Sequence, residues 1–182
     1  ILGAVFAGGI AMQATPDSPR AIVIAILVAG VVGGMLWAAI TALLRDRFNA
    51  NEILVSLMLV YVAEMVLSYL VYGPWKDPAG YNFPQTVTFA NPAKVPRLFD
   101  GLRVNVGLVI ALVAVAGMTI FLFRLFRGFQ ALVGGQASAA ARYAGFSSRT
   151  ALWTALLTSG GLAGLAGALE ATGPLGQLTP YV

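Results

Sequence analysis

Four apolar runs of membrane-spanning length limit this chain to very few folds. They cover residues 21–44, 53–71, 104–123 and 151–171, and the first continues for 24 residues without a charged side chain. A helix needs about 20 predominantly apolar residues to cross the hydrocarbon core of a bilayer. We therefore predict an all-α, polytopic transmembrane helix bundle with about four full spans. The shorter apolar run at 1–13 is expected to be the tail of a truncated first helix.

The composition agrees with a membrane protein and excludes several kinds of chemistry. Of the 182 residues, 59% are hydrophobic and 10% are charged, and the mean hydropathy is +0.84. A soluble domain carries about 25% charged residues. The chain has no cysteine and no histidine, which removes disulfides, thiolate chemistry and histidine-based metal or acid–base sites. We expect no metal and no cofactor.

The ends and the charge of the chain lead to two further expectations. Because the chain begins with Ile1 rather than Met and stops just after a stretch rich in proline and glycine, we expect it to be a piece of a longer protein. The net charge of +4 is divided among separate loops. It does not form the dense basic face that nucleic-acid binding requires, so no nucleic-acid partner is expected.

Two long connections separate the spans. Residues 72–103 hold five of the nine prolines together with several aromatic side chains, which predicts an ordered loop outside the membrane. Residues 124–150 form the other connection. Basic residues near the span ends number six on the side of 124–150 and five on the side of 72–103. The positive-inside rule thus narrowly favours the cytoplasm for 124–150 and the extracytoplasmic side for 72–103.

The connection at 124–150 is predicted to be a loop with one short helix. Residues 137–144 are rich in alanine, the best helix former. The glycine pair at 134–135 frees the backbone before this helix, and Gly145 is a natural C-terminal stop. Ser147 or Ser148 can cap the span that follows. A short exposed helix beneath a membrane domain can dock into a partner, which is our working hypothesis for this segment.

Five motifs occur in a fixed order: NEILVSLML at 51–59, YLVYGPWKDP at 69–78, NFPQT at 82–86, AARYAG at 140–145 and SGGLAGLAGALE at 159–170. Together they resemble the bacterial ABC-importer permease family of the ribose and branched-chain amino acid type, most closely its nucleoside and simple-sugar branch. The resemblance covers nearly the whole chain from about Ala21. One departure stands before the fourth motif, where an Asn-Pro pair common in the family is replaced by Ala137-Ser138.

The resemblance implies the permease subunit of an ATP-driven importer for nucleosides or simple sugars, which forms the translocation path. It implies a multi-pass protein of the bacterial inner (plasma) membrane. The implied partners are a cytoplasmic ABC ATPase, a second permease subunit, an extracytoplasmic substrate-binding lipoprotein, a small-molecule substrate and the lipid bilayer. The chain itself is not expected to be an enzyme, since no Walker lysine loop is present. The implied ATPase-coupling residues are Ala140, Ala141, Arg142, Tyr143, Ala144 and Gly145.

The second span carries a carboxylate, Glu64, near its middle. A charged side chain there costs about 2.5–3.5 kcal/mol on insertion scales, so Glu64 is expected not to face lipid. Helical spacing places Tyr61 and Ser68 on the same stripe. Two readings stay open. The stripe either borders the translocation path, or it only helps helices to pack, with Glu64 protonated or hydrogen-bonded between them.

Small residues predict close helix packing in two spans. Gly30 and Gly34 form a small-xxx-small pair in the first, and Gly160, Gly164 and Gly167 are the packing candidates in the fourth. Other functions also remain open. These are a secondary transporter that uses Glu64 as a proton relay, a permease for another small solute such as a branched-chain amino acid, and a membrane enzyme or structural subunit. The enzyme reading has the least support, because no acid–base pair or nucleophile cluster is visible.

Overall fold

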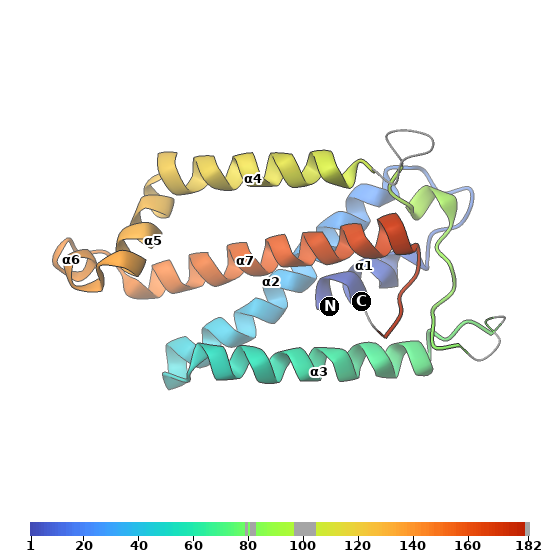
Figure 1. The fold of residues 1–182 in the computed structure, drawn as a ribbon, viewed down its shortest axis with the longest axis horizontal. Helices are drawn as coiled ribbons and strands as arrows, with labels where there is room; N and C mark the ends of the chain where they lie inside the picture. The colour runs from blue at the N-terminus through green and yellow to red at the C-terminus, as the bar shows by residue number, and fades with distance from the viewer. Residues whose placement is uncertain (79, 81–82, 97–104, 181–182) are drawn as a thin grey trace.

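The computed structural model describes residues 1–78, 80, 83–96 and 105–180, and over this part of the chain it is a bundle of helices (Figure 1). Four helices are long and apolar enough to cross a membrane, which confirms the predicted polytopic helix bundle. The elements in order are α1 (Leu2–Ala11), α2 (Ile22–Phe48), α3 (Glu52–Tyr72), the 3₁₀ turn η1 (Asn91–Ala93), α4 (Gly107–Arg124), α5 (Phe126–Gln136), α6 (Ser138–Tyr143), α7 (Ser148–Glu170) and the π-helical turn η2 (Ala171–Leu175).

The first span is longer than its apolar run, because α2 continues through Arg45 and Arg47. Basic side chains in the last turn interact favourably with the negative end of the helix dipole. The helix ends at Asn49, whose φ of 49° is the left-handed conformation that asparagine tolerates. Two residues later the side chain of Asn51 accepts a hydrogen bond from the backbone N–H of Ile53 (3.0 Å) and caps α3. The connection between α2 and α3 is therefore a turn of only a few residues.

The centre of the bundle is the antiparallel pair of α2 and α7, which meet through glycine. A Cβ atom added at Gly34 would lie 2.8 Å from the Cα atom of Gly164. A Cβ atom added at Gly30 would lie 2.5 Å from the Cβ atom of Ala168. Real Cβ atoms do not come so close to other heavy atoms, so the two helices can adopt this separation only because Gly30 and Gly34 lack side chains. Small residues serve the same purpose wherever helices associate in lipid.

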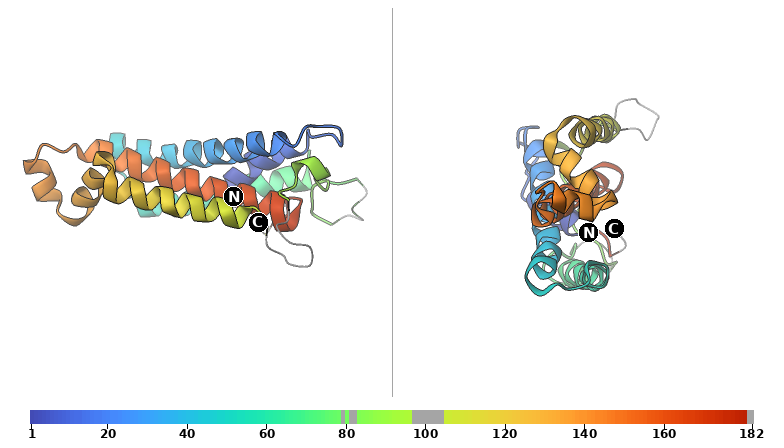
Figure 2. Two further views of the ribbon diagram at one scale, coloured as in Figure 1. Left: turned by 90° about the horizontal axis from the view of Figure 1, so that it is seen from above. Right: turned by 90° about the vertical axis from the view of Figure 1, so that its left-hand side faces the viewer.

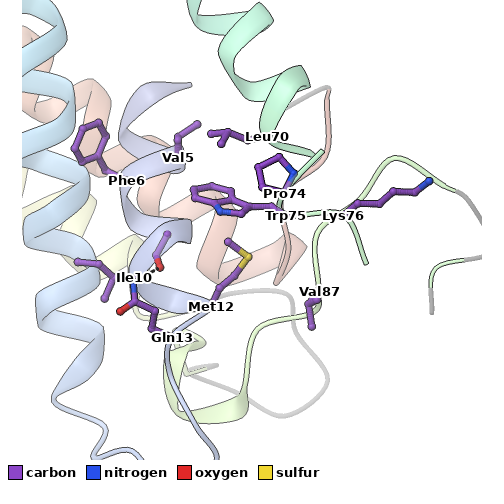
Figure 3. Close-up of a pocket in the computed structure, with 11 residues that line it drawn as sticks. Val5, Phe6, Ile10, Met12, Gln13, Leu70, Pro74, Trp75, Lys76 and Val87 are labelled. Atoms are coloured by element: carbon purple, nitrogen blue, oxygen red, sulfur yellow. Dashed lines mark hydrogen bonds between the residues drawn. The ribbon is translucent and has the colours of Figure 1, made fainter. Parts of the chain in front are cut away.

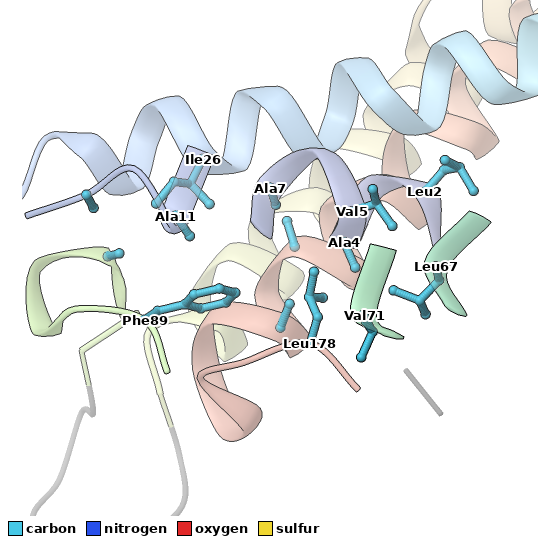
Figure 4. Close-up of a cluster of buried hydrophobic side chains, with 14 of the residues drawn as sticks. Leu2, Ala4, Val5, Ala7, Ala11, Ile26, Leu67, Val71, Phe89 and Leu178 are labelled. Carbon is cyan, nitrogen blue, oxygen red and sulfur yellow. The ribbon is translucent and has the colours of Figure 1, made fainter. Parts of the chain in front are cut away.

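The short helix α1 contacts both α2 and α7 and supplies much of the buried core. A Cβ atom added at Gly3 would lie 2.6 Å from the carbonyl oxygen of Gly164, so α1 joins the same close contact. Its alanines Ala4, Ala7 and Ala11 are almost completely buried. The sequence predicted only the tail of a helix here. The structure makes that segment the element around which side chains of α2, α3, α7 and the long loop gather (Figure 4).

The helices α3 and α4 lie on opposite sides of the α2–α7 pair (Figure 1). Helix α3 buries one narrow stripe, Ala63, Leu67 and Val71, and leaves most of its other side chains exposed. Only Gly107 is buried in α4 among its described residues. The α5–α6 segment and the loop that contains η1 lie at opposite ends of the long axis (Figure 2).

The described part of the 72–103 loop pairs with the chain that follows α7. The helical path of α7 continues past Glu170 through η2, where Pro174 lies inside a π-helical turn. This turn carries the chain past the predicted end of the span and back toward the loop. Four hydrogen bonds that involve the backbone join the two segments: Thr86 N–H to Leu178 O (3.0 Å), Leu178 N–H to Thr86 Oγ1 (2.9 Å), Phe89 N–H to Gly176 O (2.8 Å) and Val95 N–H to Thr172 O (3.0 Å). The side chain of Gln177 also donates from Nε2 to Oε1 of Gln85 (3.3 Å).

Replacing Gly34 by alanine is expected to destabilise the bundle, because overpacking a tight contact costs about 1–3 kcal/mol. Gly117→Ala in α4 is the matched control. Nothing lies within 4 Å of a Cβ atom added there, and alanine favours a helix over glycine by about 1 kcal/mol. Thermal unfolding of the full-length protein in detergent, followed by circular dichroism, should give a lower Tm for Gly34→Ala only. An unchanged Tm for Gly34→Ala would refute the close contact.

Candidate functional site

The connection at 124–150 contains two helices, α5 and α6, where the sequence predicted one. The glycine pair at 134–135 lies inside α5 rather than before a helix. Glycine costs only about 1 kcal/mol in a helix interior, which packing can offset. The packing here is aromatic, since the rings of Phe126 and Phe129 both meet Phe146 edge to face, with centroids 5.9 and 6.3 Å apart. These contacts fold α5 against the segment that follows α6.

Helix α6 brings the six predicted coupling residues into one exposed turn at the end of the molecule. Tyr143 is 98% exposed, and Arg142 is exposed beside it. Ala141 is buried, and its carbonyl accepts the N–H of Phe146 (2.9 Å), which closes the C-terminal end of α6. Gly145 has a φ of 76°, which confirms its predicted role as a helix stop. The remaining members of the set, Ala140 and Ala144, are exposed.

An ion pair joins the first turn of α7 to the last turns of α2. Arg149 donates from Nε (2.7 Å) and contacts from Nη2 (2.6 Å) the same oxygen, Oδ2, of Asp46. The indole N–H of Trp153 donates to that oxygen as well (3.3 Å). The side chain of Asp46 is 11% exposed and that of Arg149 is 68% exposed. Ser147 caps α7 by accepting from Thr150 N–H (3.3 Å), as predicted.

Sequence reasoning gave no role to Asp46 or Trp153. More than a hundred positions separate them in the chain, and neither belongs to a local motif. A usable signal would have been the position of Asp46 in the last turns of a span, since a carboxylate at a helix C-terminus is unfavourable unless a cation lies near it. Arg149 supplies that cation from the next span in space.

The Tyr61, Glu64 and Ser68 stripe lies on α3 beside its buried face. Tyr61 is 65% exposed, Glu64 is exposed and Ser68 is half-buried. At about 100° per residue, the stripe is centred roughly a quarter of a turn from the buried residues of α3. No helix in the described part of the chain covers Glu64. The described elements therefore supply no second helix against which Glu64 could be hydrogen-bonded, as one of the two readings requires.

The three glycines predicted for packing in α7 face two different neighbours. Gly160 and Gly164 lie against Gly34 and Gly30 of α2. Gly167 faces α1 instead, where an added Cβ atom would lie 3.3 Å from the backbone nitrogen of Ala4. The glycines of α7 thus pack against both α2 and α1.

A hollow of about 630 Å³ opens at the loop end of the bundle, between α1, the end of α3 and the chain that follows it (Figure 3). Its lining is mainly apolar and includes Met12, Pro74 and Trp75. The amide of Gln13 lies at its edge and donates to the carbonyl of Gly9 (3.2 Å). Residues from α1 and from the end of α3 thus lie together at the loop end of the bundle.

Comparison with known proteins identifies the family to which this multi-pass bundle belongs. Residues 1–178 match the family described as branched-chain amino acid transport system / permease component, and the chain belongs to that family. This confirms the resemblance found in the motifs. No solved structure matches the chain.

Curated relatives carry narrower descriptions. The chain is 36% identical over 160 residues to the glucose ABC transporter permease protein of Haloferax volcanii. It is 31% identical over 153 residues to the guanosine ABC transporter permease protein of Bacillus subtilis (strain 168) and 27% identical over 166 residues to the nucleoside ABC transporter permease protein of Lactococcus lactis subsp. cremoris. These alignments cover 82%, 82% and 87% of this chain, but only 42%, 43% and 46% of the relatives, so the chain spans less than half of their length.

Asp46→Asn is expected to loosen the contact between the ends of α2 and α7. It removes the charge that Arg149 pairs with, and because Arg149 is largely exposed the loss should stay below about 1 kcal/mol. Asp17→Asn, an exposed acid at the opposite end, is the control. The Tm of the full-length protein in detergent should fall for Asp46→Asn at low salt, and the difference should shrink at high salt as screening increases. A salt-independent difference would rule out a contribution from the ion pair.

Proposed function

We propose that the chain is part of the permease subunit of an ATP-driven importer for nucleosides or simple sugars in a bacterial inner membrane. The observation that carries this proposal is membership of the permease family together with relatives described as glucose, guanosine and nucleoside ABC transporter permeases. The four helices of membrane-spanning length agree with a translocation unit.

A cytoplasmic ABC ATPase then hydrolyses the ATP, and this ATPase docks on α6. Arg142 and Tyr143 project from the end of the bundle without cover from the described chain. Arginine offers a planar fork of donors for carboxylates and carbonyls. Both residue types are enriched among the side chains that dominate binding energy at protein interfaces. This assignment places the α5–α6 end in the cytoplasm.

The short distance in sequence between α6 and α7 gives a route from the ATPase to the membrane helices. Gly145 ends α6, and Ser147 already caps α7. A displacement of α6 therefore reaches the first turn of α7, where the ion pair between Arg149 and Asp46 connects α7 to α2.

At the other end of the bundle, the loop at 72–103 would meet a substrate-binding lipoprotein. A second permease subunit would complete the translocation path.

Arg142→Glu or Tyr143→Ala is expected to lower transport and transport-coupled ATP hydrolysis strongly, because each removes an interface anchor. Assembly in the membrane and substrate capture by the binding protein should be unchanged. Arg20→Glu makes the same charge change at the opposite end and serves as the control. The measurements are ATP-driven uptake into proteoliposomes and ATPase rate for the complete complex. Normal transport by both variants would mean that α6 is not the docking site.

The Tyr61, Glu64 and Ser68 stripe is proposed to border the translocation path, where its hydroxyl and carboxyl groups meet the hydroxyls of a solute. Its exposure on α3 is compatible with a path completed by further helices or by the second subunit. Intramembrane ionisable residues mark transport pathways often enough to make this the working hypothesis.

Glu64→Gln should transport at nearly the normal rate, because the amide keeps the shape and the hydrogen-bonding capacity of the side chain. Glu64→Leu should impair transport without loss of assembly. Uptake driven by ATP and uptake driven by a proton gradient are measured separately in proteoliposomes. Full transport by Glu64→Leu would leave Glu64 no role in the path. A steep loss in Glu64→Gln that follows the proton gradient would favour a secondary transporter instead.

A further inference from the structure

A cavity of about 280 Å³ lies between α1, α2, α3 and α7, apart from the stripe on α3. It forms beside the point where Gly34 of α2 meets Gly160 and Gly164 of α7, with α3 on its other side. Its polar lining comes from three different helices: Trp37 and Thr41 of α2, Ser56 of α3 and Ser159 of α7.

Two hydroxyl groups of this lining have no hydrogen-bond partner within the described residues. Thr41 is 5% exposed, and its hydroxyl makes no bond to the described chain; Ser159, at the exposed rim, makes none either. No buried side-chain oxygen or nitrogen among the described residues lacks a partner, so the unbonded hydroxyl of Thr41 is accessible rather than enclosed in packed protein. Other hydroxyls in the helical segments donate to the carbonyl four residues earlier, as do those of Ser56 (2.6 Å), Thr119 (2.8 Å), Thr158 (2.7 Å) and Thr172 (2.7 Å).

The rest of the lining restricts what could bind there. No described side chain that lines the cavity is charged, so the side chains favour an uncharged ligand. Trp37 is the aromatic member of the lining, and its indole N–H has no partner in the described chain. An indole offers an apolar face to a ring and a donor at its edge. The volume lies near the lower limit of about 300 Å³ for ligand pockets, which favours a small molecule.

We propose that this cavity binds a small neutral solute with several hydroxyl groups on a ring, such as a monosaccharide or the ribose of a nucleoside. Thr41 and Ser159 exchange hydrogen bonds with the hydroxyls of the solute, and Trp37 packs against its ring. The inference rests on the proposed transport function and deepens it by giving the solute a resting site among the inner helices.

Thr41→Val removes one hydroxyl at nearly constant volume, and Ser159→Ala removes the other. Each should lower ATP-driven uptake of glucose or uridine by the complete complex about three- to tenfold, the loss expected for one hydrogen bond. Thr158→Val is the matched control, because its hydroxyl is already bonded within α7 to Thr154 and it does not line the cavity. Its uptake should equal that of the wild type.

A second measurement reports binding without transport. Ser159→Cys places a thiol in a chain that has no cysteine of its own, and its rate of modification by a small methanethiosulfonate reagent can be followed in the full-length permease. Glucose, ribose and uridine are tested separately, which distinguishes a hexose site from a ribose or nucleoside site. At least one should slow the reaction several-fold, whereas leucine at the same concentration should not.

The two measurements separate the failure of this inference from the failure of the proposed function. If the wild-type complex transports but Thr41→Val and Ser159→Ala match Thr158→Val and no polyol protects the thiol, the cavity is not a solute site. Equal protection by leucine would overturn the hydroxyl-based recognition. If the wild-type complex transports neither sugars nor nucleosides, the proposed function is wrong, and thiol protection alone then decides whether the cavity binds a polyol.

Discussion

The close approach of α2 and α7 is the contact on which the rest of the molecule depends. In a bilayer, lipid tails are as apolar as leucine, so helices are held together by packing and hydrogen bonding rather than by exclusion of water. Glycine at Gly34 and Gly164 lets the two backbones meet directly. The same contact sets Asp46 opposite Arg149 at one end of the pair and places Thr41 and Ser159 around one cavity. Side chains at these glycines would separate all of these partners.

The spans, and the residues that begin and end the helices, were predictable from the sequence because they depend on local chemistry. Runs of apolar residues determine where a helix can cross a membrane, and a left-handed backbone at Gly145 or a hydroxyl at Ser147 acts within a few residues. The family could also be predicted, because its motifs are local and ordered. The segment at 124–150 was correctly predicted to connect two spans, but α5 was missed, since Phe126 and Phe129 pack on Phe146, a contact that helix propensity does not report.

What could not be predicted depends on residues far apart in the chain. The pairing of the long loop with the segment after α7 joins Thr86 to Leu178, and the ion pair joins Asp46 to Arg149. No local sequence pattern predicts either contact. Helix α1 was undervalued for the same reason, since its role comes from filling the space beside α2 and α7. The cavity with its two unbonded hydroxyls follows from this arrangement.

The order of the helices along the chain has a consequence for biosynthesis. About 100 residues separate the end of α2 from the start of α7, and ribosomes add about 5–20 residues per second. Roughly 5–20 s thus pass between the synthesis of the glycine face of α2 and the synthesis of α7, which packs against it. Helix α1 is made before α2, and the carbonyl of Gly3 lies near Gly30. Helix α1 is therefore available to this face before α7, and it can occupy part of the face until α7 is synthesised.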